Sequence, residues 1–177
     1  TVIVDKLYDY FATREDKIAV YPNYTTDVSG DIKDYIYNHV KGEFRIGFYN
    51  LDKDSNVKWA VIDIDNHSND EVVSSRIEQF LEVFRNTSIS IGLPYQIEIS
   101  KGGDFHIWFF FDEPTDAKIV RAFFRDYVLL IGEKASLPSE WVKNIEVFPK
   151  QDSLSSTSQI GNMVWLPFYG GVDDIGD

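Results

Sequence analysis

The segment that most constrains the fold is the run Trp59-Ala-Val-Ile-Asp-Ile-Asp65, which is apolar and β-branched apart from its two aspartates. Polar loops precede and follow it, so the run predicts a buried β-strand. Side chains alternate along a strand, so Asp63 and Asp65 share one face, with Cβ atoms roughly 6–7 Å apart. Two such carboxylates repel each other unless a cation lies between them, and hard oxygen ligands favour Mg²⁺ or Mn²⁺. The alternative is that the strand runs out into solvent and both aspartates are hydrated.

The rest of the chain alternates between helical patterns and strand patterns. Apolar residues at helical spacing predict helices over residues 3–12, 31–42, 69–86 and 115–131. Alternating or short apolar runs predict strands over residues 18–21, 43–49, 95–100, 106–111, 144–148 and 163–169. Ser29 or Asp31 is expected to cap the second helix, Gly42 to end it, and Thr115 to cap the last. This order predicts an α/β or α+β fold on a mixed or antiparallel sheet.

The strand before the Asp63 segment carries a second set of polar side chains. Its alternation places Arg45, Gly47 and Tyr49 on one face. A polar connection over residues 50–58 then leads to the Asp63 strand, and this order predicts a hairpin of the two strands. In that hairpin Arg45 and Tyr49 lie on the same side as the carboxylates. Arg45 could equally be an ordinary exposed charge on a strand.

The segment from Tyr95 to Phe111 predicts another hairpin. Pairing Ile99 with Ile107 buries the apolar residues together, and this register places Ser100 directly across from His106. A Ser–His hydrolase is not favoured, because no acid is well placed to orient the imidazole and no nucleophile elbow is present.

The turn of this second hairpin is rich in groups that bind anions. Gly102 and Gly103 allow backbone N–H groups to converge on an anion, and Lys101 adds a positive charge. Together with Ser100 and His106, these groups favour a cradle for a triphosphate. A plain hairpin whose glycines only make the turn is the alternative.

A third polar motif is Glu146-Val-Phe-Pro-Lys150, followed at a distance by Gly161-Asn162. Glu146 points away from its apolar neighbours, so it could complete a group of three carboxylates with Asp63 and Asp65. Lys150 could then contact a phosphate.

Composition narrows the class of protein. The 177 residues predict one domain, which we expect to be part of a longer protein. The chain has no cysteine, which excludes disulfides and thiolate zinc sites. No apolar run is long enough to span a membrane, and a cytoplasmic location is compatible with this composition. The net charge of −12 argues mildly against nucleic-acid binding, because phosphate neutralisation dominates that affinity.

Three motifs occur in a fixed order: D-I-D (Asp63, Asp65), S-K-G-G-x-x-H running into W-F-F-F-D-E-P (Ser100 to Pro114), and E-V-F-P-K-Q (Glu146 to Gln151) followed by G-N and L-P. Together they resemble the catalytic core of the archaeo-eukaryotic primase superfamily. The resemblance is closest to the primase-polymerase domains of TOTE conflict systems and of CRISPR-associated proteins. It extends from about Arg45 to Gly171.

The resemblance implies a nucleotidyltransferase that uses two Mg²⁺ or Mn²⁺ ions, held by Asp63, Asp65 and Glu146. It also implies that Ser100 and His106 bind the phosphates of the incoming (d)NTP. Further nucleotide contacts are expected from the resemblance at Lys101, Lys150, Asn162 and, beside the sugar, Tyr49, and from the patterns above at Gly102, Gly103 and Arg45. The fold it implies is an RRM-like mixed or antiparallel sheet flanked by helices, with an additional αβ unit.

The expected partners are single-stranded DNA template and primer, together with helicase, nuclease or CRISPR-associated domains of a longer protein. The chain departs from the family pattern in having no zinc module and in having Glu146 where aspartate is commoner. Two other functions stay open. One is a metal-dependent nuclease that uses the same carboxylates. The other is an inactive module that binds single strands, for which aromatics interleaved with Lys or Arg would be expected, and the basic residues are few.

Overall fold

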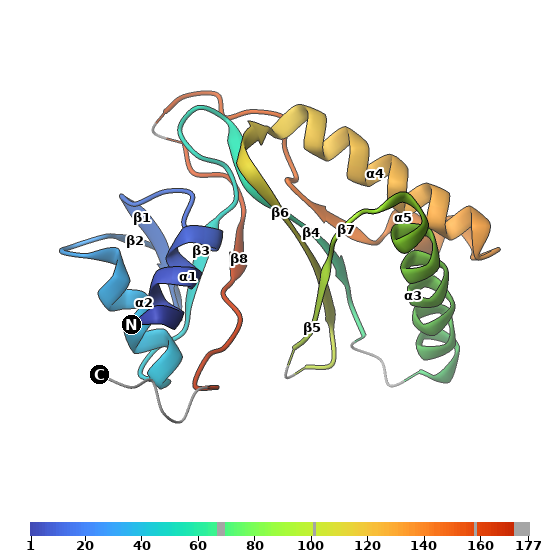
Figure 1. Ribbon diagram of the computed structural model, residues 1–177, viewed down its shortest axis with the longest axis horizontal. Coiled ribbons are helices and arrows are strands. Elements are labelled where there is room, and N and C mark those ends of the chain that lie inside the picture. Colours follow the sequence, from blue (N-terminus) through green and yellow to red (C-terminus); the bar gives the residue numbers. More distant parts are fainter. Residues whose placement is uncertain (67–69, 101, 158, 172–177) are drawn as a thin grey trace. The chain divides into compact units, whose positions relative to one another are not determined.

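The computed structural model describes residues 1–66, 70–100, 102–157 and 159–171 (Figure 1). The helices are α1 Val2–Phe11, α2 Ile32–Lys41, α3 Glu71–Ile91, α4 Ala117–Lys134 and α5 Ser139–Lys143. The strands are β1 Lys17–Val20, β2 Asn23–Asp27, β3 Ile46–Tyr49, β4 Asn56–Ile64, β5 Gln96–Ile99, β6 Phe105–Asp116, β7 Glu146–Phe148 and β8 Met163–Trp165. The strands form two four-stranded sheets, which confirms the predicted α/β class with antiparallel pairing.

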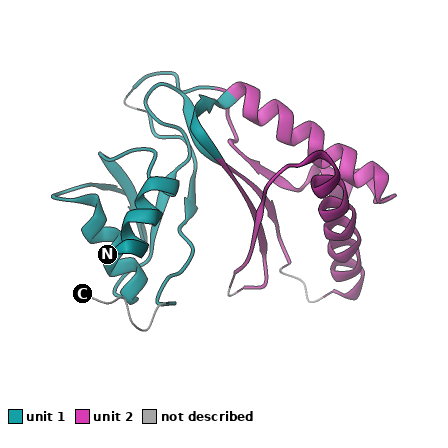
Figure 2. Cartoon of the chain, viewed as in Figure 1, with its two compact units in different colours: residues 1–59, 111–117, 153–177 teal, residues 60–110, 118–152 magenta. Residues whose placement is uncertain are grey.

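The chain divides into two compact units (Figure 2). Unit 1 contains residues 1–59, 111–117 and 153–177, and unit 2 contains residues 60–110 and 118–152. The chain passes from one unit to the other inside β4 and again inside β6. Within the described residues, no helix is long and apolar enough to cross a membrane.

Unit 1 is built on the sheet β2-β1-β3-β8, with α1 and α2 on one face (Figure 1). Its second helix follows the local signals closely, because the Asp31 side chain accepts a hydrogen bond from the Lys33 N–H and Gly42 ends the helix in the left-handed conformation. His39 is fully buried: its Nδ1 accepts from the Ile46 N–H, and its Nε2 lies 3.0 Å from the Pro167 carbonyl. His39 is therefore a packing residue that joins the helix to β3.

Unit 2 is built on the sheet β5-β6-β4-β7, with an aromatic core between this sheet and its helices. Phe109 of β6 contacts Phe84 of α3 and Phe124 of α4, at ring-centroid distances of 6.1 and 4.3 Å. The Ser88 hydroxyl lies 2.6 Å from the Tyr127 hydroxyl and joins the two long helices inside this core. Because side chains alternate along β6, His106 and Trp108 lie on the face opposite to Phe109.

The predicted hairpin between the strand over 43–49 and the Asp63 strand is wrong. β3 pairs with β1 and β8 in one sheet, whereas β4 lies between β6 and β7 in the other. Arg45 and Tyr49 therefore do not share a sheet with Asp63. Alternation indicates which face a side chain takes, but it does not indicate which strand lies alongside, and both strands here pair with segments distant in sequence.

Several element ends also differ from those predicted. β6 continues through Pro114, which lies beyond the part of β6 that pairs with β5, so its missing N–H interrupts no bond to that strand. Thr115 is consequently in the strand, and its hydroxyl donates to the Glu113 carbonyl instead of capping α4. The helix α3 runs on to Ile91, with Gly92 as its C-cap, and β8 ends at Trp165. The strand β2 was not predicted, because its N-Y-T-T-D sequence is polar and mostly exposed.

Candidate active site

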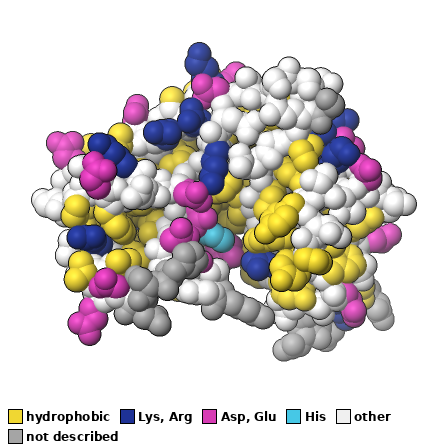
Figure 3. All heavy atoms as spheres, turned by 180° about the vertical axis from the view of Figure 1, so that it is seen from behind, with side chains coloured by type: hydrophobic (Ala, Val, Ile, Leu, Met, Phe, Trp, Pro, Cys, Tyr) yellow, Lys and Arg dark blue, Asp and Glu magenta, His cyan; other side chains and the backbone are white. Residues whose placement is uncertain are grey.

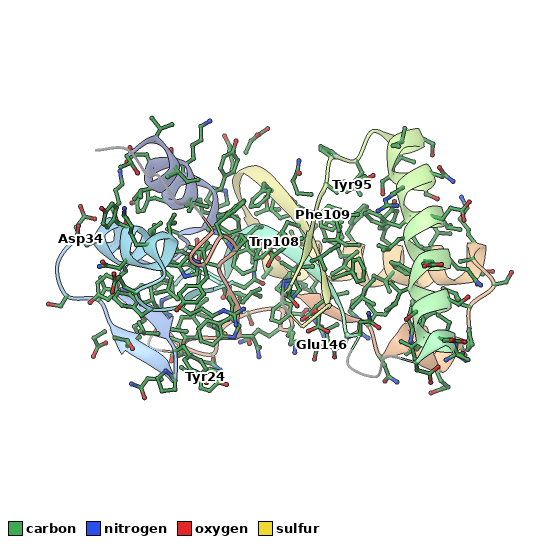
Figure 4. All side chains as sticks on the ribbon, turned by 90° about the horizontal axis from the view of Figure 1, so that it is seen from below. Tyr24, Asp34, Tyr95, Trp108, Phe109 and Glu146 are labelled. Carbon is green, nitrogen blue, oxygen red and sulfur yellow. The ribbon has the colours of Figure 1, made fainter. Side chains whose placement is uncertain are left out.

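The acids Asp63 and Glu146 lie directly opposite each other on neighbouring strands of unit 2. β4 and β7 are antiparallel, and their register pairs Asp63 with Glu146. Paired residues project from the same face of a sheet with Cβ atoms about 4.5–5.5 Å apart. The Asp63 side chain is 17% exposed and that of Glu146 is 43% exposed, so the pair reaches from the sheet toward solvent. Figure 4 labels Glu146 on β7 and Trp108 on β6.

His106 lies between two carboxylates. Its Nε2 is 3.3 Å from Asp63 Oδ1, and its Nδ1 is 3.6 Å from Glu98 Oε1. Glu98 is fixed in turn by the Trp108 indole, whose Nε1–H donates to its Oε2 at 2.8 Å. Burial by itself lowers the pKa of His106, but Asp63 and Glu98 outweigh it and raise this pKa to about 10. The imidazole is therefore a cation at neutral pH. Figure 3 shows a histidine side chain at the surface with acidic side chains beside it.

A second cation contacts the other acid of the pair. Lys150 Nζ lies 2.7 Å from Glu146 Oε1 and 4.8 Å from the centroid of the Phe148 ring. Each of the two facing carboxylates thus has its own positive neighbour, His106 for Asp63 and Lys150 for Glu146. These contacts offset the repulsion that the facing acids would otherwise suffer.

The turn that joins β5 and β6 is closed by two hydrogen bonds between Ser100 and Asp104. The Ser100 N–H donates to the Asp104 carbonyl at 2.8 Å, and the Ser100 hydroxyl accepts from the Asp104 N–H at 3.1 Å. Gly103 has a φ of +88°, which favours glycine. The Asp104 carboxylate accepts from the Asn66 N–H at 2.8 Å, which ties the turn to the end of β4. Gly102 lies in this turn, and Lys101 lies outside the described residues.

The register predicted for this hairpin is wrong by two residues. The structure pairs Ile97 with Ile107 and Glu98 with His106. A shift of two keeps every side chain on its predicted face but changes its neighbour, so Glu98 takes the place opposite His106 that Ser100 was expected to occupy. The tight Ser100–Asp104 closure is the physical reason, because it leaves a shorter loop than the one assumed. The expectation that no acid is placed to orient His106 is therefore wrong as well.

The other predicted site residues divide between the units. Asp65 follows the last residue of β4 and is exposed. In unit 1, the Tyr49 side chain is buried, and its hydroxyl donates to the Tyr24 carbonyl. The Arg45 guanidinium stacks on the Trp165 ring at 5.1 Å, and the Asn162 carbonyl accepts from the Asn50 N–H at 3.0 Å.

The facing acids suit a divalent cation in chemistry. Among the described residues, no three Asp, Glu or His side chains gather closely enough to hold a metal ion. Asp63 and Glu146 nevertheless present carboxylate oxygens, which Mg²⁺ and Mn²⁺ prefer. The Asp63 Oδ1 atom is buried without a hydrogen-bond partner in the described part of the chain. Its positive neighbour is the His106 imidazole, in an ion pair at 3.3 Å. A buried anionic oxygen that forms no hydrogen bond keeps lone pairs for a metal ion, so Asp63 and Glu146 fit a divalent cation.

Comparison with protein families places the chain in the archaeo-eukaryotic primase class. The matching model is described as the TOTE conflict system, Archaeo-Eukaryotic Primase domain, and it covers residues 5–174. The chain therefore belongs to this TOTE primase-domain family, as the three sequence motifs predicted. A comparison with curated proteins gave no match. Membership implies nucleotidyl transfer of the primase or polymerase type, with nucleotides and nucleic acid as substrates and divalent metal ions as the usual cofactors of the family.

Proposed function

We propose that this chain is the catalytic domain of a DNA primase-polymerase. It joins the α-phosphate of a (d)NTP to a 3′-hydroxyl on a single-stranded DNA template, releases pyrophosphate, and includes primer synthesis among its activities. The observation that carries the proposal is the facing pair Asp63 and Glu146, with the His106 cation against Asp63, in a chain of the primase family.

Asp63, Asp65 and Glu146 are the residues we assign to two Mg²⁺ or Mn²⁺ ions. Such ions lower the pKa of a 3′-hydroxyl and neutralise a triphosphate. The pairing of Asp63 with Glu146 sets two of these ligands on one face of the sheet, and Asp65 follows two residues along from Asp63.

We propose that His106 and Lys150 stabilise the negative charge that develops on the phosphate oxygens during the reaction. The imidazole carries its charge at neutral pH, and Glu98 and Trp108 hold it in place. A fixed positive group of this kind stabilises a transition state without reorganising. Ser100, Gly102, Gly103 and Lys101 supply the phosphate-binding turn in this proposal, and Asp104 orients that turn relative to the end of β4.

The residues of unit 1 enter the proposal as further nucleotide contacts. We propose that Tyr49 contacts the sugar, that Asn162 contacts the incoming nucleotide, and that Arg45 contacts a nucleotide phosphate. We also propose that residues 1–177 act as one catalytic domain, in the cytoplasm, of a longer protein with helicase, nuclease or CRISPR-associated parts.

The test is incorporation of labelled nucleotide on primed and unprimed single-stranded DNA with Mg²⁺ or Mn²⁺. Wild type is compared with Asp63→Asn, and with Asp126→Asn as a matched control, because Asp126 is an exposed carboxylate on α4. We expect extension by wild type and the control, loss of extension in Asp63→Asn, and product on the unprimed template. If wild type shortened the DNA instead, the conclusion would be that Asp63 and Glu146 serve a metal-dependent nuclease. Binding of the strand with neither reaction would make the domain an inactive binding module.

A further inference from the structure

Three aromatic side chains converge on the face of the unit 1 sheet that α1 and α2 leave open. Tyr21 and Tyr24, from the β1–β2 hairpin, are 64% and 65% exposed. Their rings lie 6.2 and 6.0 Å from the ring of Trp165 on β8. Figure 3, which views the molecule from behind, shows hydrophobic side chains gathered on its surface. We call Tyr21, Tyr24, Trp165 and the adjoining Arg45 the aromatic platform.

Small residues beneath the rings allow the platform to form. Gly47 of β3 pairs with Ala19 of β1 on one side and with Trp165 on the other. A Cβ atom at Gly47 would lie 3.2 Å from Trp165 Cε3 and 2.7 Å from the Val164 carbonyl oxygen. The nearest atom would be Met163 Cε, which is closer still, so glycine at position 47 lets β8 and its indole pack this closely on β3.

Arg45 gives the platform a positive charge. Its guanidinium lies 5.1 Å from the centroid of the Trp165 ring, and it forms no ion pair with another described residue. A guanidinium stacked on a ring keeps its N–H groups at the edge, where a phosphate can accept from them. The Tyr21 and Tyr24 rings are inclined to the indole by 63° and 43°, so the platform combines ring faces of different orientation with one phosphate-binding group.

We infer that the aromatic platform binds single-stranded nucleic acid by stacking unpaired bases on Tyr21, Tyr24 and Trp165 while Arg45 contacts a phosphate. This inference rests on the proposed function only in taking a nucleic-acid strand as the ligand. Stacking tolerates any base, because every base has a flat aromatic face, and Arg45 supplies the positive charge beside the rings. A nucleic-acid strand is favoured over a protein partner as the ligand, because the chain belongs to a primase family whose substrates include nucleic acid.

The test measures binding of fluorescent oligo(dT) and of an abasic strand of equal length in EDTA, where nucleotidyl transfer cannot occur. The variants are Tyr21→Ala with Tyr24→Ala, and Arg45→Gln. The control is Tyr10→Ala, which removes a tyrosine that is 54% exposed on α1. Both platform tyrosines are exposed, so their removal should leave the fold intact, and circular dichroism checks this.

We expect wild type to prefer oligo(dT) over the abasic strand, because only the former has bases to stack. The double tyrosine variant should bind oligo(dT) about tenfold more weakly or worse, and the control should match wild type. Arg45→Gln should make the dependence of affinity on salt shallower, by a slope of about 0.7. Each of these results would support the inference that the aromatic platform binds single-stranded nucleic acid.

Equal binding of both strands by wild type, or unchanged oligo(dT) binding by the double variant, would overturn the inference. The inference would also be overturned if wild type formed a dimer and the double variant were a monomer that still bound oligo(dT). In that case the aromatic platform would join two copies of the chain. A protein that shows the expected binding but incorporates no nucleotide keeps this inference and overturns the proposed function.

Discussion

Glu98 lies directly opposite His106 across β5 and β6, and its carboxylate contacts the imidazole with one oxygen and the Trp108 indole N–H with the other. The imidazole is therefore held from two sides, by Glu98 at Nδ1 and by Asp63 at Nε2. The charge and the orientation of His106 both depend on a residue that none of the three sequence motifs includes.

Glu98→Gln should slow nucleotide incorporation roughly tenfold, as the loss of a supporting partner typically does. The pKa of His106 should fall, because one of the two carboxylates that raise it is gone. NMR titration of the imidazole together with the incorporation rate checks this. Glu78→Gln, at an exposed position of α3, is the matched control. An unchanged imidazole titration in Glu98→Gln would contradict the assignment.

Binding of Mn²⁺ should stabilise the fold through Asp63 and Glu146. At one hundred times the Kd, a ligand adds about 2.7 kcal/mol, which corresponds to roughly 5–10 °C in Tm for a chain of this size. Thermal denaturation with and without Mn²⁺ measures the shift. Asp63→Asn and Glu146→Gln should each lose most of it, and Asp126→Asn should keep it. A full shift in both site variants would place the ion elsewhere.

The pair of Arg14 and Asp16 should make stability depend on pH below about 4. Arg14 is buried and donates to both Asp16 oxygens, and this lowers the pKa of Asp16. A lowered pKa means that the stabilisation is complete above the unfolded-state value near 3.9 and is lost as the pH falls toward the folded-state value.

Asp16→Asn should therefore destabilise the protein at pH 6 by about 1 kcal/mol, the size expected for a pair screened by solvent on one side. The difference from wild type should shrink by pH 3. Urea denaturation at the two pH values measures it. A difference that stays the same at both would show that the charge of Asp16 is not its source.

Gly47→Ala should destabilise unit 1 by about 1–3 kcal/mol, the usual effect of overpacking. The new Cβ would meet the Val164 carbonyl at 2.7 Å, and that contact is with backbone, so the two strands must move apart. Gly171→Ala is the control, because its Cβ would make only ordinary contacts of 3.6 Å or more. The measurement is the Tm of each variant. Equal Tm values would contradict the prediction and would mean that β8 can move away from β3 at little cost in stability.

The sequence predicted the features that depend on local chemistry. Asp31 and Gly42 bound α2 as expected, because capping involves only neighbouring residues. The Asp63 strand was recognised from its own composition. The pairing of Asp63 with Glu146 could not be derived, because it joins strands separated by more than eighty residues.

Glu98 was missed for a different reason. The faces of its hairpin were predicted correctly, but the register was set by matching isoleucines and not by the Ser100–Asp104 closure. The aromatic platform was missed because its rings come from two distant segments, so counting basic residues along the chain could not reveal one arginine lying among them.

The ion pairs at the facing acids bear on how strongly this site would bind a metal ion. With His106 and Lys150 as built-in counter-ions, the chain can fold in a chelator without leaving bare charges side by side. A divalent ion held by Asp63 and Glu146 would compete with these two cations, so we expect its affinity for the protein alone to be low. A nucleotide that brought its own divalent ion would avoid this competition, so we expect metal affinity to be higher in the presence of nucleotide than in its absence.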